Sequence, residues 1–166
     1  MPLVNRGLVT HGASVCSMTV THPSPSEEVA VTGTGTPDLN PANGGYEPVL
    51  NIYQPGAISG SLFDQLADGR VQVNRPALLD ISGYADVAQT ANNSTIGIVF
   101  CVERDGVITL SPRAVHARMP NADDIGNISG GGLLRAEAGD IIGLHVASDK
   151  TGDISFVSSN LIFREV

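Results

Sequence analysis

The closing stretch of the chain, Leu133 to Val166, decides the fold: L-L-R-A-E-A-G-D-I-I-G-L-H-V-A-S-D-K-T-G-D-I-S-F-V-S-S-N-L-I-F-R-E-V. Its short apolar runs are separated by glycine and aspartate, a pattern that predicts strands joined by tight turns. We expect a turn at Gly139-Asp140 and a polar hairpin over Asp149 to Asp153. The strands expected around these turns are Ile141 to Ser148, Ile154 to Ser159 and Leu161 to Val166.

The composition extends the all-β prediction to the whole chain. Its 166 residues suit one domain, or one domain with an arm, and 42% of them are hydrophobic, which is ordinary for a globular protein. The 19 glycines and 10 prolines fall between short apolar runs, as they do in all-β proteins. Because aromatic residues make up only 4% and tryptophan is absent, we expect a core of valine, isoleucine, leucine and alanine.

Two internal stretches indicate how strands face the core. From Leu79 to Val87, apolar residues alternate with polar ones, which predicts a strand with one buried and one solvated face. From Ile96 to Glu103 both alternating sets are largely apolar, so the outer side of this strand needs a cover, and a partner subunit is one such cover. The run Gly130-Gly131-Gly132 predicts a strongly bent strand or a bulge.

The first 44 residues look different from the remainder. The segments Ser14 to His22 and Glu28 to Thr32 are rich in β-branched or alternating residues, and a Pro-rich loop separates them. The following stretch, Thr32 to Gly45, has many glycines and prolines and no period, so we expect a loop or linker. The sequence therefore predicts an N-terminal arm or small β module over residues 1–44 and a main β domain over residues 45–166.

Charge and cysteine content exclude several classes of partner. The net charge is −8 with a single lysine, Lys150, and dispersed arginines, so we expect neither nucleic acid nor an anionic membrane as a partner. Cys16 and Cys101 are far apart in sequence, and two free thiols are favoured over a disulfide. The N-terminus lacks the pattern of a secretory signal, so we expect synthesis in a cytoplasm.

No motif predicts catalysis. The histidines, His11, His22, His116 and His145, lack the spacing of a zinc site, and neither a nucleophile elbow nor a phosphate-binding loop is present. We therefore predict no catalytic, cofactor or metal site and no enzymatic activity. An enzyme such as a cupin-like metalloprotein remains the contrasting hypothesis, which metal analysis of the purified protein would test.

Three stretches in the last two thirds of the chain resemble the trimeric jelly roll of the tumour-necrosis-factor and complement-globular-head type. They are D-G-R-V-Q-V-N-R-P-A-L-L-D-I from Asp68 to Ile81, A-E-A-G-D-I-I-G-L-H-V from Ala136 to Val146, and S-N-L-I-F from Ser159 to Phe163. The resemblance covers about residues 60 to 166. Ala77, Leu79 and Ala136 depart from the glycine, tyrosine and leucine that this family favours.

The resemblance implies an antiparallel β-sandwich (jelly roll) with an N-terminal β-hairpin or extended arm, assembled as a homotrimer. We place Val99, Cys101, Leu161 and Phe163 at the trimer interface. An acidic, lysine-poor version with an arm is similar to the capsid decoration (cement) proteins of tailed phages. That function implies synthesis in the host cytoplasm, a location on the capsid surface of the virion, and the major capsid protein as partner.

The alternative is a jelly-roll binding module of a phage appendage that recognises host-surface glycan or another protein. Sugar sites usually offer aromatic platforms, and the tyrosines available for this are Tyr46, Tyr53 and Tyr84.

Overall fold

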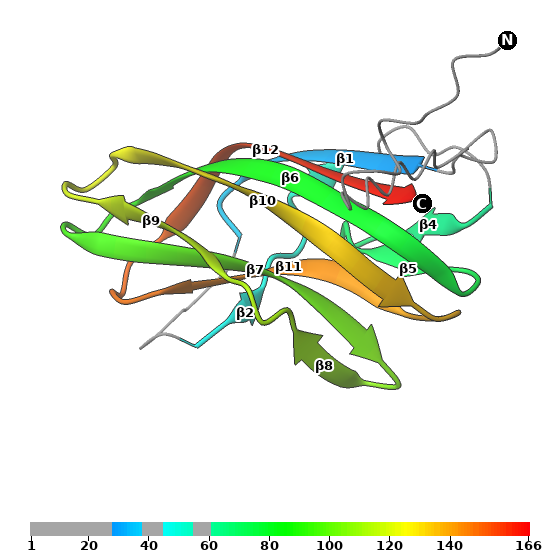
Figure 1. Ribbon diagram of the computed structural model, residues 1–166. Coiled ribbons are helices and arrows are strands. Elements are labelled where there is room, and N and C mark those ends of the chain that lie inside the picture. The colour runs from blue at the N-terminus through cyan, green and yellow to red at the C-terminus, as the bar shows by residue number, and fades with distance from the viewer. Residues whose placement is uncertain (1–27, 38–44, 55–60) are drawn as a thin grey trace, which may run out of the picture.

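Two antiparallel sheets form a sandwich in the computed structural model, which describes residues 28–37, 45–54 and 61–166 (Figure 1). The five-stranded sheet has the order β10 (Ile125–Ala136), β6 (Ala77–Gln89), β12 (Ile154–Glu165), β1 (Glu28–Gly35) and β3 (Tyr53–Gln54). The seven-stranded sheet has the order β4 (Phe63–Gln65), β5 (Val71–Val73), β11 (Ile141–Ser148), β7 (Ser94–Arg104) and β8 (Val107–Leu110). Two further strands of this sheet are β2 (Glu47–Pro48), which pairs with β11, and β9 (Val115–Met119), which pairs with β7.

The predicted fold class, an all-β antiparallel sandwich, is confirmed. On β6 the alternation divides the strand as expected, because Leu79, Ile81 and Val87 are buried while Ser82 and Tyr84 are exposed. Among the described residues, the structure has no helix long and apolar enough to cross a membrane.

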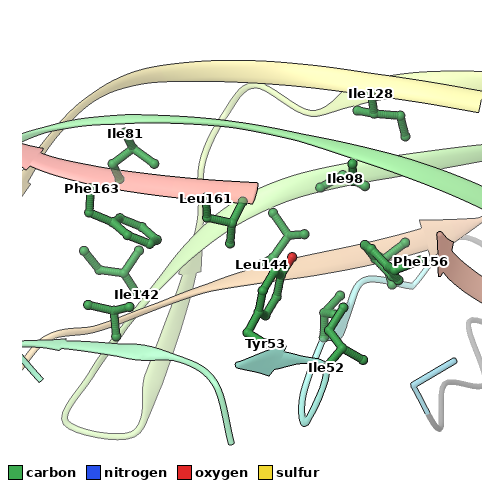
Figure 2. Packing of buried hydrophobic residues seen from close by; sticks show 14 of the residues in the cluster. Ile52, Tyr53, Ile81, Ile98, Ile128, Ile142, Leu144, Phe156, Leu161 and Phe163 are labelled. Carbon is green, nitrogen blue, oxygen red and sulfur yellow. The ribbon is translucent and has the colours of Figure 1, made fainter. Parts of the chain in front are cut away.

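The core lies between the sheets and consists mainly of aliphatic side chains with three phenylalanines (Figure 2). Leu161 and Phe163 point from β12 toward Leu144 and Ile142 of β11 on the facing sheet. The rings of Phe163 and Phe100 meet edge to face, with centroids 6.5 Å apart. Full burial of a side chain of this size stabilises the fold by about 1.5–3 kcal/mol, so this layer is a main source of stability.

The turn predicted at Gly139-Asp140 is confirmed, and the structure shows what holds it. Gly139 has a φ of 89°, a conformation that favours glycine. The buried carboxylate of Asp140 accepts a hydrogen bond from the Glu137 backbone N–H at 2.8 Å and from Nε of Arg104 at 2.7 Å. Nε donates to one carboxylate oxygen, and the other oxygen, which accepts from the Glu137 N–H, pairs with Nη2 of Arg104 at 2.6 Å. The turn between β10 and β11 is therefore tied to the end of β7.

The structure differs from the sequence expectations at three places. The glycine run at 130–132 has neither a bulge nor a register shift, because β10 pairs residue by residue with β6 from Ile125 to Ala136. The two closing segments form one strand, β12, whose irregularity lies between Phe156 and Ser158. The stretch from Ser111 to Asn127, which gave no strand signal, contains β9.

The predicted boundary at residue 45 does not separate the described part of the arm from the sandwich. β1 lies inside the five-stranded sheet, where it pairs with β12 on one side and β3 on the other. An inner strand shares its backbone hydrogen bonds with both neighbours and belongs to the domain. The hairpin strand predicted over Ser14 to His22 lies outside the described residues.

Candidate assembly surface

Two of the four predicted interface residues lie inside the protomer. Leu161 and Phe163 are 4% and 1% exposed and belong to the core between the sheets. A side chain that its own chain already encloses offers almost no surface to a partner. These two residues are therefore core residues, and assigning them to an interface was wrong for this physical reason.

Val99 and Cys101 lie on the outer face of the seven-stranded sheet, as the alternation predicts, but the protomer itself already covers them. Their side chains are 3% and 4% exposed in the single chain. The stem of Arg70 extends over Gly143, the residue paired with Cys101. The Arg70 guanidinium is held by Asp68 at 2.8 Å and by Glu103 at 2.6 Å.

Burial also defines the chemistry of this face. It raises the pKa of the Cys101 thiol to about 11, so the thiol is protonated at neutral pH and a poor nucleophile. Burial lowers the pKa of His145, whose Nδ1 has no hydrogen-bond partner in the described residues. Within the same residues, no three histidine, cysteine, aspartate or glutamate side chains are grouped to hold a metal ion.

The surface with most exposed apolar side chains lies where the two sheets end side by side. β8 is the last strand of the seven-stranded sheet and β10 the last strand of the five-stranded sheet. On these strands Val107, Ile108, Leu110 and Leu133 are 66%, 49%, 38% and 70% exposed. We call these four residues the apolar edge. Leu133 pairs with Asp80 and lies on the outer face of the five-stranded sheet, whereas Ile108 and Leu110 lie on the outer face of the seven-stranded sheet. Because the outer sides of both strands are unpaired in the described chain, this edge presents apolar side chains together with free backbone groups.

A second apolar surface lies on the outer face of the five-stranded sheet. Leu78 and Tyr84 of β6 are 40% and 43% exposed there, and Ile162 of β12 is half-buried on the same face. We call these three residues the Tyr84 face. Tyr84 is the exposed member of the three tyrosines, since Tyr46 is half-buried and Tyr53 lies in the core.

The sequence contained part of the signal for both surfaces. Alternation placed Tyr84 on the solvated side of its strand, and the largely apolar run from Val107 to Leu110 is typical of a strand. What alternation cannot show is which strand ends a sheet, because that depends on pairings between residues far apart in sequence. The exposure of Leu133 follows from the same topology, since β10 pairs only with β6 in its sheet.

Comparison with known proteins supports the fold assignment. No family model matches the chain, and no curated protein matches it in sequence. Among solved structures, murine APRIL at pH 5.0 is similar with a TM-score of 0.61 and 18% identity, over 85% of this chain and 99% of that chain. Murine APRIL at pH 8.0 gives 0.59 and 15% over 84% and 99%, and the Eiger TNF of S. frugiperda gives 0.56 and 12% over 84% and 93%. The chain therefore has the fold of a tumour-necrosis-factor-like jelly roll.

Proposed function

We propose that this chain is a structural module that assembles as a homotrimer and decorates the capsid of a tailed phage. The observation that carries the proposal is the pair of exposed apolar surfaces, the apolar edge and the Tyr84 face, on a tumour-necrosis-factor-like sandwich. Apolar patches of this kind on a soluble domain are typical of protein–protein contacts.

Two different surfaces are what threefold symmetry requires. In a closed trimer each interface is heterologous, so one patch of a protomer contacts a different patch of the next. The apolar edge and the Tyr84 face provide such a pair, because the β8 residues of the apolar edge belong to the seven-stranded sheet and the Tyr84 face belongs to the five-stranded sheet. A twofold dimer would instead need one self-complementary patch.

The phage assignment rests on the resemblance and on charge. An acidic surface with a single lysine is unsuited to nucleic acid or an anionic membrane, so we favour protein as the assembly partner. We assign the contacts with the major capsid protein to the residues that precede β1 and to exposed strand edges, which add backbone hydrogen bonds to a neighbouring sheet. The protein then resides on the capsid surface of the virion.

The glycan-binding alternative has less support. A sugar platform needs an exposed aromatic ring, and among the described tyrosines only Tyr84 is exposed. The same ring serves equally as an apolar anchor in an interface.

A reconstitution experiment tests the proposal. Capsids of the phage that encodes the chain, prepared without its gene, are incubated with the purified protein and imaged by electron cryomicroscopy. We expect added trimeric density on the shell and increased resistance of the capsids to heat. Capsids that remain bare at saturating protein concentration, or a gene that has no capsid protein gene nearby, would contradict the capsid role.

Matched variants link binding to the apolar edge. Leu133→Lys places a charge in the apolar edge, whereas Val157→Lys places the same charge at an exposed apolar position of β12 that is 47% exposed. We expect the first variant to lose the trimer and the capsid density while the second retains both. Equal behaviour of the two variants would show that assembly uses another surface.

A further inference from the structure

An apolar cleft lies between the two sheets next to the apolar edge. Its volume is about 590 Å³, within the range of roughly 300–1,000 Å³ that is usual for small-molecule sites. One wall comes from Ile98 to Val102 of β7 and the facing wall from Gly130 to Leu134 of β10. The segment from Thr109 to Val115 borders the cleft between these walls.

The cleft exists because inward positions of the five-stranded sheet lack side chains. Paired residues on neighbouring strands share a face, so Gly132 faces inward with the buried Ile81, and Gly130 faces inward with Gly83. A Cβ added to Gly132 would meet no atom within 4 Å. Space is therefore open at this position, which is itself exposed at the border of the cleft.

The lining combines apolar walls with one charge. Among the described residues, Arg113 is the one charged residue that lines the cleft, and its side chain is exposed, which places it at the mouth. Its guanidinium takes part in no ion pair in the described part of the chain. The hydroxyl-bearing residues Thr109 and Ser111 lie on the same bordering segment. A ligand that matches this lining has an apolar body and a single anionic end.

We propose that the cleft binds a free long-chain carboxylate, with its alkyl chain between the glycine positions of β10 and the apolar face of β7, and its carboxylate at Arg113. A guanidinium binds a carboxylate through two parallel hydrogen bonds, which fixes the direction in which the chain enters. The net charge of −8 makes this local cation important, since the remainder of the surface repels an anion. The lining belongs to one protomer and includes Leu110 and Leu133 of the apolar edge, so the site adjoins the proposed trimer contact but does not depend on the capsid role.

Titration calorimetry of the full chain with dodecanoate and with the uncharged 1-dodecanol tests the two parts of the proposal separately. Gly132→Leu fills the cleft, and Gly132→Val is a second filling variant in case the first does not fold. Ser129→Leu is the matched control, because it adds the same side chain to β10 on the opposite face. Arg113→Gln removes the charge at the mouth.

We expect one dodecanoate per chain, at least tenfold weaker binding in the Gly132 variants, and a change of less than twofold in Ser129→Leu. Arg113→Gln should weaken dodecanoate at least fivefold and leave 1-dodecanol unchanged. Absence of binding to the wild-type chain, or equal binding in the Gly132 variants, would overturn the proposal. If the wild-type chain binds no ligand, sedimentation of the Gly132 variants shows why. Loss of the oligomer in these variants would mean that the cleft holds side chains of a second copy.

Discussion

Strands β12 and β10 flank the same strand, β6, yet the space beneath them is filled differently. Under β12 the inward side chains of Phe156, Leu161 and Phe163 are 1–4% exposed and meet the facing sheet. Under β10 two of the inward positions, at residues 130 and 132, are glycines that border an open cleft. The position of a strand in the sheet therefore decides its contribution. The central strand, β12, stabilises the fold, and β10, at the end of the sheet, provides surfaces that can bind a partner or ligand.

Truncation of a β12 side chain should have the largest effect on stability. Phe163→Ala removes a ring that is 1% exposed, and it should lower the free energy of unfolding by about 3–5 kcal/mol. Leu133→Ala on β10 removes a side chain that is 70% exposed and should change it by less than about 0.5 kcal/mol. Urea unfolding followed by circular dichroism measures both, under conditions in which the two variants are in the same oligomeric state. If both variants lost a similar free energy of unfolding, the proposed difference in stability between β12 and β10 would be wrong.

The link between the β10–β11 turn and the end of β7 should have the next largest effect. Asp140→Asn weakens the hydrogen bonds to Arg104 and removes the negative charge beside its guanidinium. Because hydrogen bonds to a charged group are worth about 1.5–3 kcal/mol each, we expect a loss of about 2 kcal/mol at pH 7.

The same variant has a defined pH dependence. The hydrogen bond from Arg104 lowers the pKa of the Asp140 carboxyl below its usual value of 3.8. A depressed pKa in the folded state stabilises the protein above the pKa of the unfolded chain, and the contribution is lost as pH falls through the folded pKa. Urea midpoints should therefore differ between wild type and Asp140→Asn at pH 7, and the difference should shrink as the pH falls below the usual carboxyl pKa of 3.8. A difference that persisted unchanged at low pH would show that the charge is not the stabilising element.

The smallest changes in stability are expected for alanine substitutions at two neighbouring glycines of β10, and they should have opposite signs. A Cβ on Gly131 would collide with the carbonyl oxygen of Ile81, so Gly131→Ala should destabilise the chain by about 1–2 kcal/mol. Gly132 has open space, so Gly132→Ala should stabilise it by about 0.5–1 kcal/mol through reduced backbone entropy of the unfolded chain. Thermal unfolding distinguishes the two signs. A loss of stability in Gly132→Ala would indicate that the cleft is narrower than the structure describes.

Local patterns predicted much of the fold. Alternation was sufficient to orient β6, and glycine with aspartate was sufficient to place the turn at Gly139-Asp140. These features depend on residues that are neighbours in sequence, so they can be predicted from the sequence alone. Val99 and Cys101 are apolar residues on the outer face of β7, and their apolar character was likewise sufficient to predict that this face is covered.

The candidate site was harder to predict because it depends on distant pairings. Leu161 and Leu133 are the same residue type on strands, yet one is enclosed by the facing sheet and the other protrudes from a sheet edge. Similarly, the glycine run at 130–132 predicted a strongly bent strand or a bulge, and the strand that it forms has no bulge and borders a cleft. Which strands end each sheet is a property of topology, and alternation carries no information about it.

The central claim is that the apolar edge and the Tyr84 face join three copies of this chain. The most direct test is the mass of the purified protein by sedimentation equilibrium at micromolar concentration, measured beside Leu133→Lys. We predict a single species of three times the 17.2 kDa chain mass for the wild type, and a species of one chain mass for the variant. A wild-type protein that sediments as a monodisperse monomer would contradict the claim.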